Sequence, residues 1–171
     1  MDPRLALFTM ALAVASMQVA ARADADTLGI YRDWALTCSG DDCRLAQTLM
    51  SPDRIWIATV MLHPRGEGSR LAEVFVPPGV HFPSGLFVTT AGDRPLRGDW
   101  IRCSATACES MLRLDARAEA QWRAGAVAEL RFRPSPQAPV AMADISLMGV
   151  SAGLAALDEV ARDGRSNGGD G

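Results

Sequence analysis

The chain of 171 residues contains no lysine, so all 17 of its basic residues are arginine. Acidic residues number 20, and the formal net charge at pH 7 is −3. Proteins that bind nucleic acid through phosphate contacts carry an excess of positive charge, and the same holds for electrostatic docking to anionic membranes. The sequence therefore predicts no nucleic-acid partner, and any partner must be recognised by shape and by local patches.

Residues and motifs typical of catalysis are scarce. Only two histidines occur, His63 and His81, and each is interpreted as a surface or partly packed side chain. The chain has no nucleophile elbow, no zinc-protease motif, no phosphate-binding glycine loop and no EF-hand loop. We therefore predict a protein that is not an enzyme and has no cofactor and no bound metal. The alternative is an exported hydrolase, whose site would need His81, Asp93 and Asp99 to converge in one pocket.

Long apolar runs are missing except near the N-terminus, over residues 5–21. This run follows a short segment with one basic residue and ends at Ala21-Arg22-Ala23, a small-x-small pattern suited to signal peptidase. A bilayer span needs about 20 apolar residues, and this run is shorter and interrupted by polar residues. We predict a signal peptide over residues 1–23, cleaved after Ala23, and no transmembrane segment in the mature protein. The mature protein would be periplasmic or secreted.

The remaining chain is long enough for one domain that buries about two-thirds of its unfolded surface. We predict a single domain over residues 24–163, opened by a loose leader at residues 24–29. Residues 164–171 are rich in glycine and polar residues, and we predict a disordered tail there.

Short segments with β-strand patterns dominate this domain. Residues 126–133 have the clearest alternation, with apolar side chains on one face and charged ones on the other. Residues 55–62 are apolar on both faces, which indicates a central strand. The other predicted strands are residues 30–38, 43–50, 71–76, 86–90, 100–103, 108–114 and 140–143.

A helical period appears only late in the chain. Leu147, Val150, Leu154 and Leu157 recur at spacings of three and four. Asp144 or Ser146 is expected to cap this helix, and Gly164 to end it. Residues 115–124 are expected to form one or two helical turns. The pattern predicts a mainly β fold, a compact β-sandwich or barrel-like domain with one C-terminal α-helix.

Four cysteines form two C-x4-C pairs, Cys38 with Cys43 and Cys103 with Cys108. An even count with repeated spacing behind an export signal favours disulfides. Chain entropy would favour a long bridge between the pairs, but a tight turn brings the two cysteines of one motif within bonding distance. We predict two short-range disulfides, Cys38–Cys43 and Cys103–Cys108. Crossed connectivities and a four-cysteine structural zinc site are the alternatives.

One aromatic residue lies in a charged stretch. Trp122 follows Gln121 and precedes Arg123, and an exposed aromatic beside arginine is a typical contact residue. We predict that Trp122 and Arg123 form a surface contact site.

Several short patterns occur together in a recognisable order. They are Trp34-x-x-x-Cys38, Cys43-Arg44-x-x-Gln47, Pro78-Gly79-Val80, Cys103-x4-Cys108 and Ser146-Leu147-x-Gly149-Val150. In this order and spacing the chain resembles the invasion-associated locus B family of exported bacterial proteins. The resemblance implies a compact β-rich fold and no assigned catalytic activity. We therefore expect a non-catalytic binding protein whose partner is an unknown protein or envelope component, with a role in host-cell interaction or in the envelope.

Overall fold

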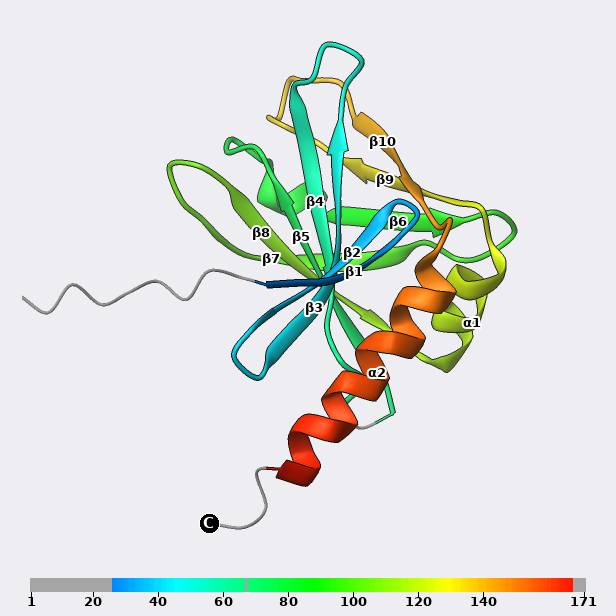
Figure 1. Cartoon of the computed structure of the whole chain (residues 1–171). Helices are drawn as coiled ribbons and strands as arrows, with labels where there is room; N and C mark the ends of the chain where they lie inside the picture. The colour runs from blue at the N-terminus through cyan, green and yellow to red at the C-terminus, as the bar shows by residue number, and fades with distance from the viewer. Residues whose placement is uncertain (1–25, 67, 168–171) are drawn as a thin grey trace, which may run out of the picture.

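The computed structural model describes residues 26–66 and 68–167, and within them one antiparallel sheet contains every strand (Figure 1). The sheet order is β1-β2-β3-β4-β5-β8-β7-β6-β9-β10. The strands are β1 Asp26–Tyr31, β2 Trp34–Ser39, β3 Asp42–Met50, β4 Trp56–Leu62, β5 Arg70–Val76, β6 Leu86–Thr90, β7 Leu96–Cys103, β8 Cys108–Leu114, β9 Val127–Phe132 and β10 Ala141–Ser146. The sheet curls into a half-barrel that brings β10 close to β3, although the two strands do not pair.

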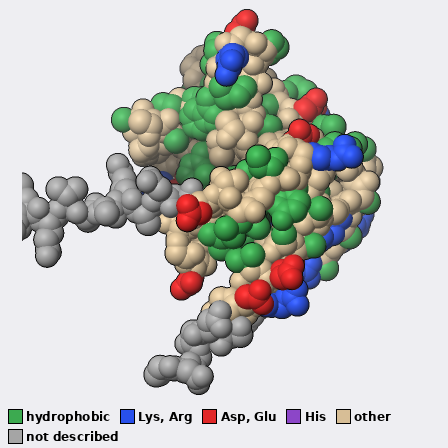
Figure 2. Space-filling view, in the orientation of Figure 1, with side chains coloured by type: hydrophobic (Ala, Val, Ile, Leu, Met, Phe, Trp, Pro, Cys, Tyr) green, Lys and Arg blue, Asp and Glu red, His purple; other side chains and the backbone are tan. Residues whose placement is uncertain are grey.

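Three helical segments accompany the sheet. A short 3₁₀ turn, η1, covers Phe82–Ser84, α1 covers Ala116–Ala124, and α2 covers Val150–Asn167. Helix α2 packs against β1, β2, β3 and α1 and lies on the lower side of the molecule in Figure 1. Figure 2 shows acidic and basic side chains interspersed along the outward side of this helix. Within the described residues, no helix combines the length and apolar character needed to cross a bilayer.

The core lies inside the curl of the sheet, because alternate side chains of each strand point inward. In β5, for example, Ala72, Val74 and Val76 are buried while their neighbours are half-exposed. Leu154 and Leu157 of α2 close the core on one side. The predicted mainly β fold with one C-terminal helix is confirmed, in the form of a half-barrel.

Four local predictions were wrong toward the ends of the chain. Residues 26–29 belong to β1 rather than to a loose leader, and a turn at Arg32, with φ of 56°, divides the predicted strand 30–38 into β1 and β2. Asp144 and Ser146 lie in β10 and do not cap α2, which begins only at Val150. Gly164 lies within α2, where an added β-carbon would meet nothing within 4 Å, and it does not end the helix.

The predicted signal peptide, residues 1–23, and residues 168–171 lie outside the described residues. Of the predicted disordered tail, residues 164–171, the first four residues lie in α2. The cleavage predicted after Ala23 and the disorder predicted for the rest of the tail stay predictions.

Candidate functional site

The first predicted disulfide, Cys38–Cys43, joins two residues that face each other across the β2–β3 ladder. The next pair along the ladder is Ser39 with Asp42, so the turn itself contains only Gly40 and Asp41. Gly40 has a φ of 59°, which glycine adopts without strain at the first central position of such a turn. The turn therefore places the two cysteines in register, 4.0 Å apart at their α-carbons.

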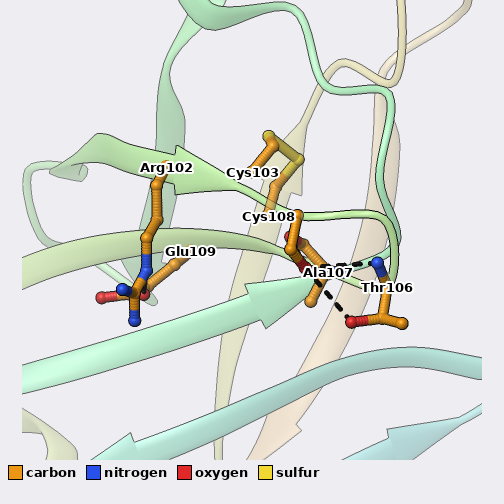
Figure 3. The surroundings of a disulfide bond; sticks show 7 residues. Arg102, Cys103, Thr106, Ala107, Cys108 and Glu109 are labelled. Carbon is orange, nitrogen blue, oxygen red and sulfur yellow. Dashed lines mark hydrogen bonds and ion pairs between the residues drawn. A yellow bond between two sulfur atoms is a disulfide. The ribbon is translucent and has the colours of Figure 1, made fainter.

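The second disulfide, Cys103–Cys108, joins facing residues of β7 and β8 (Figure 3). Ser104 organises the turn, because its hydroxyl accepts from the backbone N–H groups of Thr106 and Ala107 at 3.2 and 3.1 Å. The described residues include no free cysteine. Both short-range disulfides are thus confirmed, and the crossed connectivities and the four-cysteine zinc site are wrong.

The three residues of the hydrolase hypothesis do not converge. His81 lies before η1 and its Nδ1 is 2.7 Å from Ser84 Oγ, whereas Asp93 lies in the turn beyond the other end of β6. The Asp93 carboxylate accepts from Arg117 at 2.9 Å. Asp99, on β7, has a side chain that is 84% exposed. Among the described residues, no group of three or more His, Cys, Asp or Glu side chains is placed to hold a metal ion.

The predicted exposure of Trp122 was wrong, because the side chain is 2% exposed. Asp115 caps α1 by accepting from the N–H of Ala118 at 2.8 Å, and from this start Ala118 and Trp122 share the face of the helix that points into the core. The Trp122 ring packs against Trp34 with centroids 6.4 Å apart. Arg123, on the flank of the helix, is half-buried and donates to Glu119 and to the carbonyl oxygen of Ser151. Its part in a contact site stays a prediction.

Arg123 belongs to a cluster of charged side chains that lies between β5, α1 and α2. Arg70 of β5 is completely buried; its Nε donates to Glu119 at 3.1 Å, and its Nη2 donates to both oxygens of Asp158 at 2.8 Å. Glu119 also accepts from Arg123 at 2.8 and 2.9 Å and lies 2.8 Å from Arg65. The cluster ties β5, α1 and α2 together.

Burial by itself raises the pKa of Glu119, because it disfavours the charged carboxylate. The hydrogen bonds from Arg123 and Arg65 and the charge of Arg70 outweigh burial and lower the pKa to about 2. Glu119 is therefore ionised throughout the neutral and mildly acidic range. Each of its partners is an arginine that stabilises this charge, which makes the cluster a structural element rather than an acid or base.

A second set of contacts closes the half-barrel where β10 approaches β3. The side-chain amide of Gln47 makes two hydrogen bonds with Ser146: its Nε2 donates to the carbonyl oxygen and its Oε1 accepts from the N–H, both at 3.0 Å. Trp34 Nε1 donates to the same carbonyl oxygen at 2.8 Å. We call Trp34, Gln47 and Ser146 the latch, because they join the two limbs of the curled sheet.

Gly149 allows the chain to turn from the latch into α2. Its φ is 92°, and a β-carbon at this position would overlap the carbonyl oxygen of Tyr31. Trp34, Gln47, Ser146 and Gly149 all belong to the patterns on which the family resemblance rests. The structure thus brings together motifs from the two ends of the domain, and their common role is to close the fold.

Beyond the latch, the approach of β10 to β3 leaves a groove of about 510 Å³. Residues from β3 and β4 form one wall, and residues from β10 and the β1–β2 turn form the other. They are Gln47, Thr48, Leu49, Met50 and Ile57 on the first side, and Ala143, Asp144, Ser146 and Asp33 on the second. The groove combines apolar surface with two carboxylates, and none of these described lining residues is basic. Sequence reasoning missed this groove, because Gln47 and Ser146, on its two walls, are 99 residues apart in the chain.

The comparisons with known proteins agree with the fold. The sequence model of the Invasion associated locus B (IalB) protein family matches residues 34–158, which is most of the chain. A search of curated proteins finds no match. The crystal structure of invasion associated protein B from Bartonella henselae is similar, with a TM-score of 0.71 and 17% sequence identity, over 78% of this chain and 97% of that one. At this identity the likeness establishes the fold, and the family match over residues 34–158 shows that the chain belongs to the invasion associated locus B family.

Proposed function

We propose that the chain is an exported protein, periplasmic or secreted, that acts by binding a protein or envelope component and not by catalysis. The observation that carries the proposal is the groove between β10 and β3, which is open, partly apolar and acidic. Pockets of 300–1,000 Å³ with apolar walls and a few polar groups are typical of binding sites. His81, Asp93 and Asp99 do not form a common site, so they give no support to the hydrolase hypothesis over a binding function.

Two further observations support export. Disulfides persist in oxidising compartments such as the periplasm and the extracellular space, and all four cysteines are paired. The N-terminal run up to Ala23 has the composition of a signal peptide. We infer that cleavage after Ala23 releases a mature protein whose turns are closed by oxidation after export.

The target of binding follows from the family and from the acidic groove. The similar structure is named as an invasion associated protein, and on that basis we propose a protein of the envelope or of a host-cell surface as the partner. Nucleic acid is not proposed, because a groove containing Asp33 and Asp144 repels phosphate.

Site-specific photo-crosslinking in intact cells tests the binding function. A photoreactive amino acid replaces Thr48, which is exposed on the groove wall, and in a matched control it replaces Ala120, which is exposed on α1. We expect a protein adduct from position 48 and none from position 120. Adducts of equal yield at both positions, or none at either, would contradict the proposal.

Fractionation of the same cells tests export. The mature protein is expected in the periplasm or the medium, beginning at Asp24 and gaining four hydrogens on reduction. A chain that retains residues 1–23 in the cytoplasm would refute the predicted localisation.

A further inference from the structure

We propose that the groove binds an extended peptide segment, which adds a strand to the free edge of β10 and places a basic side chain against Asp144. This inference rests on the proposed binding function and specifies how the partner is recognised. Strand addition uses main-chain hydrogen bonds for affinity and alternate side chains for specificity. The edge, the latch and the charges of the groove each support it.

The hydrogen-bond pattern shows which groups of β10 are free. Among the described strands, β10 pairs with β9 alone, on one of its two sides. The N–H of Leu147, just beyond the strand, donates to the carbonyl oxygen of Ala126, which precedes β9, at 2.8 Å, so odd-numbered residues direct their backbone groups toward β9. Because these groups alternate along an antiparallel strand, the even-numbered residues Met142, Asp144 and Ser146 direct theirs toward the free edge.

Gln47 shows that this edge accepts a strand-like partner. A residue of an adjacent strand would accept from the N–H of Ser146 and donate to its carbonyl oxygen, and the Gln47 side chain does both. It thereby occupies one residue position of a missing strand. The backbone groups of Met142 and Asp144 have no partner on this side among the described residues, so the edge continues unpaired along the groove.

Within the part of the chain that the structure describes, the β10 edge has no lysine, proline or bulge to block strand addition. Natural edge strands are protected by lysine, proline, bulges or a covering segment. β10 contains no basic residue or proline, its register with β9 is continuous, and Met142 is 57% exposed on its outer side. Its single charge, Asp144, is exposed and lines the groove.

The acidic residues of the groove favour a peptide that carries a basic side chain. Asp144 and Asp33 are acidic and the other lining residues are neutral, so an extended segment with a basic side chain flanked by apolar ones complements the groove. A second copy of this chain fits less well. Two β10 edges paired antiparallel through their free residues would bring both Asp144 carboxylates close together, which is destabilising.

Peptide binding to the full mature protein tests the proposal. The probe is a fluorescent, blocked pentapeptide that alternates valine and arginine, and its dissociation constant is measured by anisotropy at low salt. One comparison peptide alternates valine and glutamate, and another has the first sequence with alternate backbone nitrogens methylated. We expect both comparison peptides to bind at least about tenfold more weakly, because one loses the charge attraction and the other the main-chain donors.

Variants of β10 test whether peptide binding depends on the backbone N–H groups of this strand. Met142→Pro removes the outward N–H without removing a bond to β9, since proline is tolerated on edges whose N–H faces solvent. Its matched control, Met142→Val, changes the side chain but keeps the N–H. We expect at least about tenfold weaker binding for M142P than for M142V, with equal unfolding midpoints for the two. Asp144→Arg should reverse the preference, so that the glutamate peptide binds better than the arginine peptide.

Each outcome decides the inference separately from the proposed function. If position 48 yields an adduct but the arginine peptide does not bind, the binding function stands and strand addition is overturned. Equal affinity of M142P and M142V overturns it too, because binding then depends on side chains alone. A concentration-dependent dimer, seen by sedimentation and abolished in M142P, would assign the edge to a second copy and overturn the peptide partner.

Discussion

The guanidinium of Arg70 and the carboxylate of Glu119 form an ion pair in the interior, with Nε 3.1 Å from Oε2 and side chains that are 0% and 2% exposed. Removing one partner of such a pair leaves the other charge buried and uncompensated, which costs about 3–5 kcal/mol. Arg70 keeps its two bonds to Asp158, so we expect the lower end of this range for Glu119→Gln. Urea unfolding of the oxidised protein measures the loss.

The matched control is Glu129→Gln, which removes a carboxylate from an exposed pair with Arg131 on β9. Surface pairs contribute about 0–1 kcal/mol, so this variant should unfold almost as the parent does. A similar loss of unfolding free energy in both variants would show that the buried ion pair of Arg70 and Glu119 stabilises the protein no more than an exposed pair does.

The low pKa of Glu119 predicts how stability depends on pH. A carboxyl whose pKa is about 2 in the folded protein, against 4.5 as the ordinary value, contributes stability that is complete above about pH 4.5. This contribution is lost as the pH falls toward 2, and it amounts to about 3 kcal/mol. The difference in unfolding free energy between the parent and E119Q should therefore shrink between pH 4.5 and 2. A difference that stays constant over that range would contradict the assignment.

Substitution of Gly149 should be among the most damaging changes in the chain. Gly149→Ala introduces a β-carbon that overlaps the Tyr31 carbonyl oxygen at a φ of 92°, and we expect a loss of about 3 kcal/mol or more. Gly164→Ala is the control, because Gly164 lies in α2 with nothing within 4 Å of an added β-carbon. Helix propensity predicts a gain of up to about 1 kcal/mol for G164A. Thermal unfolding of both variants measures the contrast.

Removing the Gln47 side chain from the latch should lower the stability of the whole protein and also speed hydrogen exchange at Ser146. Gln47→Leu leaves the N–H of Ser146 without its partner, at a cost of about 1–3 kcal/mol. Hydrogen exchange at the Ser146 amide should accelerate by more than at the other amides of β10. Thr48→Val, at the exposed neighbouring position, should change stability by less than about 0.5 kcal/mol. Unchanged exchange at Ser146 in Q47L would disprove that Gln47 closes the sheet.

The disulfides should contribute similar and moderate stability. Each closes a six-residue ring, for which chain entropy gives roughly 2 kcal/mol. Replacing Cys38 and Cys43 by serine together, or Cys103 and Cys108 together, should therefore leave a folded protein with a lower urea midpoint. Complete unfolding of either double variant would mean that the disulfide maintains more than its own hairpin.

Local sequence patterns were sufficient for most of the strands and for the two cysteine turns, but they missed β1 and the turn at Arg32. The alternation in residues 126–133 corresponds to β9, and the spacing of the cysteines around Gly40 gave the correct pairing because the two residues of each pair lie in the same hairpin. The exposure of Trp122 was mispredicted from its charged neighbours. Its spacing of four from Ala118, behind a capping aspartate at position 115, places it on the buried face of α1.

Long-range contacts could not be derived in the same way. Gln47 and Ser146 are 99 residues apart, and Arg70 and Asp158 are 88 apart. Neither pair has a local pattern that identifies its partner. Both depend on how far the sheet curls and where α2 returns to it, and the groove exists only because of that curl.

The late position of α2 in the chain has a consequence for biosynthesis. Until residues 146–158 have left the ribosome, Gln47 has no Ser146 to bond, Tyr31 has no Gly149 against it, and Arg70 has no Asp158. A nascent chain that ends at β9 thus lacks the contacts that close the half-barrel. The half-barrel therefore closes only when synthesis is nearly complete, because each of these contacts joins an early segment to residues 146–158.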